Sequence, residues 1–217
     1  MHAPFRRRTA LITSIAAGVV LALLIGVGAY GLLRGPASAH ESTNPRPTAT
    51  LTPAAAPIRN PRPLPRSYDP EAFAREAAQA LFTWDTRSPA STSEWEQAIV
   101  DAADPEEADG LAADVRAYLP TIEQWEQLRT YGTRQWLTID TARVPHAWTT
   151  AVAQAAAGQL PPGATAYTIV GTRHRAGTWG DQPAETETRV TFTVFIACPG
   201  TACCRLLRFS RLDASLQ

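Results

Sequence analysis

The stretch Val190-Thr-Phe-Thr-Val-Phe-Ile-Ala-Cys198 sets the character of the fold. Successive side chains of an extended chain point to opposite faces. Five apolar side chains would therefore share one face: Val190, Phe192, Val194, Ile196 and Cys198. Thr191 and Thr193 would lie on the other face. This period of two predicts a strand over 186–198 that buries one face against a core.

Three more segments rich in β-branched and aromatic residues predict strands over 133–143, 165–175 and 203–212. The register of the final two strands remains open. If Cys203 lies opposite Cys198, Leu207 points to the core; if Cys204 does, Leu206 points there. A β-bulge would offer a third arrangement.

Apolar residues at helical spacing precede these strands. Phe73, Ala77, Leu81 and Trp84 form one stripe after Asp69-Pro70, a helix cap followed by a first-turn proline. A helix is therefore expected from residue 70 to residue 84. Similar signals predict further helices starting at Ser91 or Ser93, over 104–118, over 121–128 and over 146–159.

Helices first, then one strand, a crossover helix and three antiparallel strands define an α+β domain over 67–217. A curved sheet wrapped around a helical layer buries the apolar faces of both. In its order of elements the domain resembles the cone-shaped nuclear-transport-factor-2-like (cystatin-like) fold.

The N-terminal part has a different character. Residues 1–10 form a basic tail with three consecutive arginines, and the 25 residues between Arg8 and Arg34 carry no charge. As a helix, residues 11–33 would span about 35 Å, enough to cross a hydrocarbon core of about 30 Å. The arginines predict a cytoplasmic N-terminus, and hence a single-pass cell-membrane protein with an extracytoplasmic C-terminal domain.

Residues 34–66 read as a proline-rich, disordered spacer, with seven prolines between His40 and Arg66. Extended at ~3.1 Å per residue, this spacer would reach about 80 Å from the membrane. The small residues that end at Ala39 also fit a signal-peptidase site, so a secreted domain is the alternative to an anchored one.

Small residues recur along the predicted membrane helix at every fourth position: Ser14, Gly18, Ala22 and Gly26. Such a stripe permits close approach of two helix backbones. Self-association of the helix is therefore a hypothesis, set against the chance occurrence of such stripes in Ala- and Gly-rich sequence.

Charge is unevenly distributed. Residues 1–66 hold eight arginines and one acid (+7), while residues 67–217 hold 12 arginines and 19 acids (−7). An acidic domain is poorly suited to a phosphate backbone, so no direct nucleic-acid binding is expected. Within it, residues 67–130 hold 14 acids and four arginines, whereas 131–217 hold five acids and eight arginines. We therefore expect an acidic helical face and a basic sheet face.

All three cysteines lie within seven residues: Cys198, Cys203 and Cys204. A zinc site would need a fourth ligand, and the nearest histidine, His174, lies outside finger-like spacing. Pro199-Gly200 indicates a turn. A disulfide that joins Cys198 to Cys203 or to Cys204 is the favoured interpretation, with free thiols as the alternative.

Acid–base candidates are sparse. His174 lies between two arginines, Asp140 lies beside Ile139 in a predicted strand, and Tyr167 and Asp85 complete the set. Nucleophile elbows, phosphate-binding glycine loops and metal-ligand clusters are absent from the sequence. We expect no catalysis, no cofactor and no metal, and keep His174 and Asp140 as weak pocket candidates.

Six tryptophans occur in the domain, and most fit predicted apolar faces. Trp179 differs because it falls in the predicted loop 176–183 between two strands. An exposed aromatic side chain at a hairpin tip is a candidate contact residue.

The layout suggests a family. The segments Ala72-Phe-Ala-Arg-Glu-Ala-Ala-Gln-Ala-Leu-Phe-Thr-Trp-Asp-Thr86, Thr191–Cys198 and Cys204–Arg208 resemble TcpC-like bitopic conjugal transfer proteins of Gram-positive, especially actinobacterial, mobile elements. Relatives often carry two such domains, whereas residues 67–217 have room for one. The resemblance implies a non-enzymatic, membrane-anchored scaffold of a type IV secretion-like conjugation apparatus.

On this resemblance the partners are other membrane proteins of a transfer channel, together with further copies of the chain in a homo-oligomer. Head-to-tail docking of the acidic and basic faces would build a ring. The alternative is an extracytoplasmic ligand-binding module or enzyme on the same fold, which requires a polar cavity where His174 or Asp140 converge.

The small-residue stripe makes a direct prediction. Residues 11–33 are expected to self-associate in a two-hybrid membrane assay, because the stripe lets two backbones pack closely. A segment that stays monomeric in that assay would remove the hypothesis.

Overall fold

The computed structural model of this protein describes residues 58–217. The predicted basic tail, the membrane helix with Ser14, Gly18, Ala22 and Gly26, and most of the spacer lie outside these residues. Within the described part, no helix combines the length and the apolar character needed to cross a membrane.

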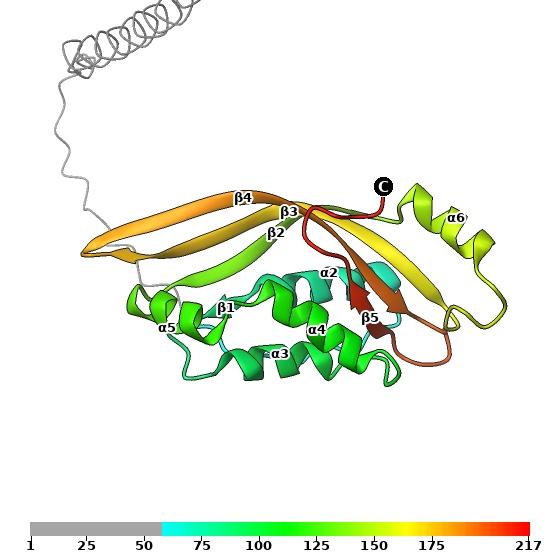
Figure 1. Cartoon of the computed structure of the whole chain (residues 1–217), viewed down its shortest axis with the longest axis horizontal. Coiled ribbons are helices and arrows are strands. Elements are labelled where there is room, and N and C mark those ends of the chain that lie inside the picture. Colours follow the sequence, from blue (N-terminus) through cyan, green and yellow to red (C-terminus); the bar gives the residue numbers. More distant parts are fainter. Residues whose placement is uncertain (1–57) are drawn as a thin grey trace, which may run out of the picture. The chain divides into compact units, whose positions relative to one another are not determined.

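A five-stranded antiparallel sheet forms one layer of the domain (Figure 1), with its strands in chain order. The strands are β1 (Trp84–Asp85), β2 (Arg134–Arg143), β3 (Ala164–Trp179), β4 (Gln182–Ala197) and β5 (Arg205–Phe209). The sheet is curved, and helices pack against it, as predicted for an α+β domain.

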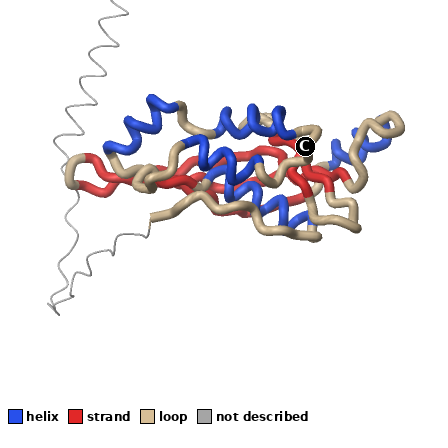
Figure 2. The backbone as a smooth tube through the Cα atoms, turned by 90° about the horizontal axis from the view of Figure 1, so that it is seen from below, coloured by secondary structure: helices blue, strands red, loops and turns tan. Residues whose placement is uncertain are grey.

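Four helices cover one face of the sheet, which we call the inner face; the opposite face is the outer face (Figures 1 and 2). They are α2 (Pro70–Phe82), α3 (Thr92–Val100), α4 (Ala108–Tyr118) and α5 (Ile122–Thr130). A separate helix, α6 (His146–Gln154), connects β2 to β3. Trp148 of α6 contacts Phe195 of β4, with ring centroids 6.0 Å apart.

The predicted caps start three of these helices. Asp69 accepts a hydrogen bond from the Ala72 amide at the start of α2. Ser91 and Thr121 each form a capping box, at α3 and α5 respectively. The predicted start of α4 at Asp104 is wrong, because this helix begins at Ala108. The Asp104 carboxylate instead accepts a hydrogen bond from the Glu106 amide and closes a turn.

Alternation along β4 builds the main core as predicted. Val190, Phe192, Val194 and Ile196 are all buried and face the helices. Phe192 contacts the rings of Phe82, Tyr118 and Phe209. The inner face of β4 is therefore the surface on which α2 and α4 pack.

A second, smaller core contains Trp84, Trp95 and Trp125. The prediction that Trp84 continues the first helix is wrong. Thr83, a β-branched residue, takes an extended conformation and ends α2 at Phe82. Trp84 instead belongs to β1, where it pairs with Gln135 of β2. Its side chain is fully buried and contacts the ring of Trp125.

The register of the last strand pair is the bulged alternative. Ile196 lies opposite Leu206 and Val194 lies opposite Phe209, so one extra residue is accommodated in β5. Leu206 and Phe209 are both buried in the core, while Arg208 is exposed.

The end of the predicted spacer belongs to the domain. Residues 58–66 lie along it, and Leu64 packs against the core. The Arg59 amide donates to the Asp85 carboxylate at 3.2 Å, and Ser88 Oγ donates to Asn60 Oδ1 at 2.8 Å. Order therefore starts before residue 67, because β1 and the turn after it hold this segment.

Asp85 joins the segment to the sheet. Burial of this carboxylate, which is fully inaccessible, would raise its pKa. Hydrogen bonds from the Arg87 side chain (2.8 Å from Nε), the Arg87 amide and the Arg59 amide outweigh that effect and hold the Asp85 pKa below its usual range.

We predict that Asp85→Asn lowers the free energy of unfolding by about 2 kcal/mol at neutral pH, since it removes a buried charge-assisted contact. Folding lowers the Asp85 pKa, so the stabilisation is fully present when the pH is above the ordinary pKa of a carboxyl group in the unfolded chain. It is lost as the pH falls through the lower folded pKa. Urea unfolding at pH 7 and pH 3 should show the difference from wild type shrinking; an equal difference at both pH values contradicts the assignment.

Candidate interaction surface

The β3–β4 hairpin extends beyond the strands that flank it. β3 pairs with β2 only between Thr168 and Ala176, and β5 reaches only the stretch of β4 from Val194 to Ala197. The far end of the hairpin lies beyond α5 in Figure 1. Side chains 182–189 are all exposed, so this end carries little of the core.

The free edge of β4 runs from Gln182 to Val190, with no described strand beside it. A two-residue turn, Gly180-Asp181, joins the strands, with Gly180 at a positive φ of 58°. The closing pair of such a hairpin is hydrogen-bonded, and pairs alternate thereafter. The backbone groups of residues 183, 185, 187 and 189 therefore point to the open edge. Pro183, which has no N–H, falls in this set, as expected for an edge strand.

Trp179 lies at the tip of this hairpin. The predicted loop 176–183 is wrong, because both strands continue to the turn and Trp179 is the last residue of β3. Its side chain is 70% exposed, and its indole stacks on Tyr131 at 5.2 Å. The amide of Thr178 also donates to the Tyr131 carbonyl. The aromatic side chain is thus held in place while one side faces solvent.

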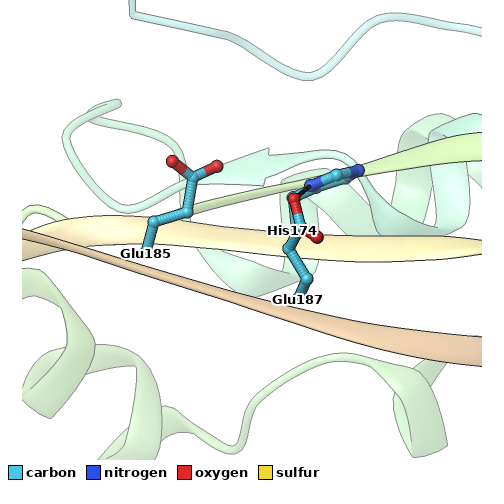
Figure 3. Close-up of side chains that lie close together, drawn as sticks. All are labelled: His174, Glu185 and Glu187. Atoms are coloured by element: carbon cyan, nitrogen blue, oxygen red, sulfur yellow. Dashed lines mark ion pairs between the residues drawn. The ribbon is translucent and has the colours of Figure 1, made fainter.

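His174 lies on the outer face of the sheet. Its ring stacks on Trp136 with centroids 5.0 Å apart and planes within 5°. Nδ1 lies 3.2 Å from a Glu187 carboxylate oxygen (Figure 3), and Nε2 lies 3.0 Å from the Thr138 hydroxyl. Both ring nitrogens have partners, and these come from the two neighbouring strands.

Asp140 lies at a β-bulge in β2, on the same face. It is exposed and forms an ion pair of 3.4 Å with Arg189. Asp140 and His174 therefore have separate partners. The structure does not bring them together as an acid–base pair.

Neither residue lines either of two cavities in the described part of the chain. A cavity of about 580 Å³ lies between residues 58–65 and helices α2 and α3. Another, of about 390 Å³, lies between the start of α6, the sheet and the last residues of the chain. His174 and Asp140 therefore lie outside both of these cavities.

Tyr167 is the third of the acid–base candidates. It is half-buried, and burial together with the Glu71 and Asp69 charges raises the pKa of its hydroxyl. A raised pKa keeps a phenol neutral, and Tyr167 packs against the main core.

Three arginines of the sheet lie in different environments. Arg189 pairs with Asp140 on the outer face, and Arg208 reaches Asp114 of α4 at 2.6 Å. Arg175 lies over the Trp84 ring and donates to Gln135 Oε1. Burial, and the charge of neighbouring Arg173, lower the Arg175 pKa. Head-to-tail docking between an acidic and a basic face stays a prediction.

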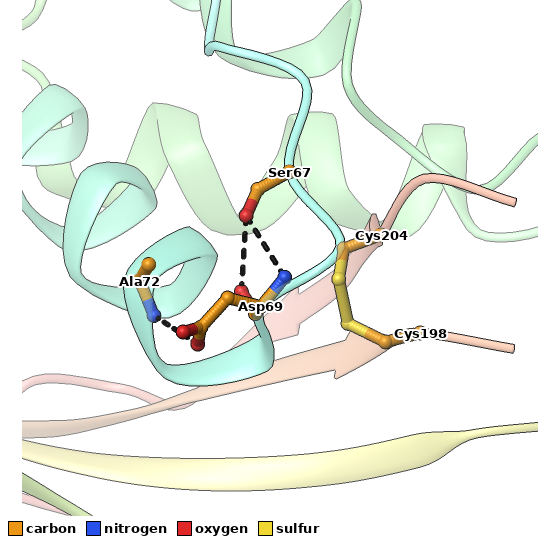
Figure 4. Close-up of a disulfide and its surroundings, with 5 residues drawn as sticks. All are labelled: Ser67, Asp69, Ala72, Cys198 and Cys204. Carbon is orange, nitrogen blue, oxygen red and sulfur yellow. Dashed lines mark hydrogen bonds between the residues drawn. A yellow bond between two sulfur atoms is a disulfide. The ribbon is translucent and has the colours of Figure 1, made fainter. Parts of the chain in front are cut away.

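The disulfide joins Cys198 to Cys204 and leaves Cys203 free (Figure 4). The Cys204 amide donates to the Ser67 carbonyl, and Ser67 Oγ accepts the Asp69 amide. The bridge thus closes the β4–β5 connection beside the first turn of α2. The side chain of Cys203 interacts with Tyr68 and raises the pKa of that hydroxyl.

Sequence reasoning missed the row formed by Trp136, His174 and Glu187. A two-residue turn at Gly180-Asp181 would have identified half of it, since that turn places His174 opposite Glu187. Trp136 joins the row only through the β2–β3 register, for which no short turn exists.

Comparisons of the chain with protein-family models, with curated proteins and with solved structures found no match.

The disulfide can be tested by counting thiols. Denatured, unreduced protein is expected to contain one reactive thiol, Cys203→Ser none, and Cys198→Ser two. Cys198→Ser should also lower the free energy of unfolding by about 2 kcal/mol, because the closed loop is short. Cys203→Ser should be neutral in the same urea titration. A free thiol in Cys203→Ser would contradict the pairing.

Proposed function

We propose that this chain is a membrane-anchored assembly protein that works through protein–protein contacts, as a scaffold component of a conjugative, type IV secretion-like transfer apparatus. Residues 11–33 would hold it in the membrane with the α+β domain outside, and the proline-rich spacer would set the distance between them. The membrane and conjugation parts of this proposal rest on the sequence pattern and the family resemblance.

The observation that supports a contact role is the free end of the β3–β4 hairpin. It combines a strand edge over residues 182–190, beside which no described strand lies, with an exposed aromatic side chain at position 179. Unpaired edges bind other strands, and soluble proteins commonly cover them. An extended segment of a partner would add to β4 through main-chain hydrogen bonds, with Trp179 at one end as an aromatic anchor.

Charged side chains along this edge limit the choice of partner. Glu185, Glu187 and Arg189 alternate with threonines, so uncontrolled pairing of two flat apolar edges is disfavoured. The edge therefore favours a strand that brings its own polar side chains, such as one from another membrane protein of the apparatus. A second copy of this chain is the other source of such a strand.

A second candidate, an extracytoplasmic ligand-binding module, is favoured by the larger cavity. Trp95 lines that cavity, and its buried indole nitrogen has no hydrogen-bond partner among the described residues. The indole nitrogens of buried Trp84 and Trp125 lack partners too, so this feature alone does not single out a ligand site.

Arg189→Pro in the full-length chain tests the contact proposal. The change removes an N–H that points to the open edge and leaves the hydrogen bonds to β3 intact, so the fold should survive. We expect at least a tenfold loss of DNA transfer frequency in cells that depend on this protein, and loss of its cross-links to membrane partners.

Arg189→Ala is the matched control, because it removes the same side chain and keeps the N–H; it should transfer DNA like wild type. Trp179→Ala should resemble Arg189→Pro. Thermal unfolding verifies that each variant is folded. Wild-type transfer by both Arg189→Pro and Trp179→Ala would refute the contact role of the hairpin.

A further inference from the structure

Three side chains with metal-ligand chemistry meet on the outer face of the hairpin (Figure 3). His174 comes from β3, and Glu185 and Glu187 come from β4. One donor atom from each lies within 4.8 Å of the other two. Glu187 lies directly opposite His174, and Glu185 is two residues closer to the turn on the same face.

The imidazole is positioned by residues that are not part of this trio. Stacking on Trp136 sets the plane of the ring, and the Thr138 hydroxyl lies 3.0 Å from Nε2. A metal-binding histidine characteristically has its second nitrogen hydrogen-bonded in this way, which fixes the tautomer and the direction of the free lone pair. When Nε2–H donates to Thr138, the Nδ1 lone pair faces the Glu187 carboxylate.

A lone pair and a carboxylate that face each other at 3.2 Å need a proton or a cation between them. The hydroxyl of Thr138 can donate or accept, so it accommodates either state of the ring. We propose that His174, Glu185 and Glu187 form a binding site for a divalent cation of the Zn²⁺ class, in which the metal replaces the proton on Nδ1.

The ligand set determines the class of metal. One imidazole and two carboxylates suit Zn²⁺ and its neighbours, whereas Ca²⁺ and Mg²⁺ prefer all-oxygen sites. Ligands about 2.1 Å from a tetrahedral ion lie roughly 3.4 Å apart. The donor atoms here lie within 4.8 Å of one another, so they must approach more closely to bind one ion. Side-chain rotation of the two glutamates can bring them closer, because both are exposed. Three protein ligands leave a coordination position open to water or to a partner's side chain.

Surrounding charges leave the two glutamates available. The Arg134 guanidinium lies over the Trp136 ring, and Arg189 is paired with Asp140. Glu185 forms no ion pair with any described residue, and His174 is the one ion-pair partner of Glu187 there. Two neighbouring carboxylates therefore present uncompensated charge, which a divalent cation would neutralise.

Zinc chloride titrated into the full-length Cys203→Ser protein tests the proposal, and this background removes the free thiol as a competing ligand. Calorimetry should show one Zn²⁺ bound per chain with a dissociation constant of about 0.1 mM or tighter. Co²⁺ should bind at the same site and quench Trp136 fluorescence, because the ring stacks on the ligating imidazole. Ca²⁺ and Mg²⁺ should have no effect at equal concentration.

Glu185→Gln and Glu187→Gln should each weaken binding at least about tenfold, and the double variant should abolish it. Both changes are isosteric and exposed, so folding is not at risk. His174→Phe keeps an aromatic ring on Trp136 and should also abolish binding, while Glu106→Gln, which changes an exposed carboxylate outside the sheet, should bind like wild type. A wild-type dissociation constant for Zn²⁺ well above about 0.1 mM would overturn the proposal. Zn²⁺ binding that the glutamine variants do not alter would overturn it as well.

Discussion

The register between β3 and β4 is the constraint on which the rest of this structure depends. The tight turn at Gly180-Asp181 sets it, and each strand then runs for 16 residues. Because side chains alternate, one register decides both faces at once. It places Phe192 on the inner face, where the helices pack, and His174 opposite Glu187 on the outer face. A slip of one residue would bury the polar row and expose the core row.

The two ends of the same hairpin differ in how much of the domain packs on them. At the end near α2, β4 contributes to the main core, pairs with β5 and is closed by the Cys198–Cys204 disulfide beside the first turn of that helix. At the other end the strands outrun β2, β5 and the helices, and their side chains are exposed. Stability is thus concentrated where the helices pack, which leaves the far end available for contacts.

The two proposals for the hairpin use different chemical groups. Strand addition would use the main chain of β4 and the indole of Trp179, whereas a cation would use side chains on the outer face. Glu185 and Glu187 belong to both regions, because their backbones face the open edge and their carboxylates face His174. A bound cation would reduce the negative charge along the edge and link the two strands through side chains. Edge binding and metal binding remain separable, since Arg189 and Trp179 supply no metal ligand.

Local sequence determined the elements, because caps and hydrophobic periodicity act within a few residues of one another. It predicted the starts of two helices at Asp69 and Thr121, narrowed a third to Ser91 or Ser93, and predicted the buried face of β4. Contacts between distant segments decided what it could not. Thr83 ends α2, and Trp84 pairs with Gln135 in the sheet instead of continuing the helix. The bulge in β5 places Arg208 where it forms an ion pair with Asp114. The row of Trp136, His174 and Glu187 exists only once three strands are in register. Residues far apart in the chain meet through such pairings, and no local pattern encodes their geometry.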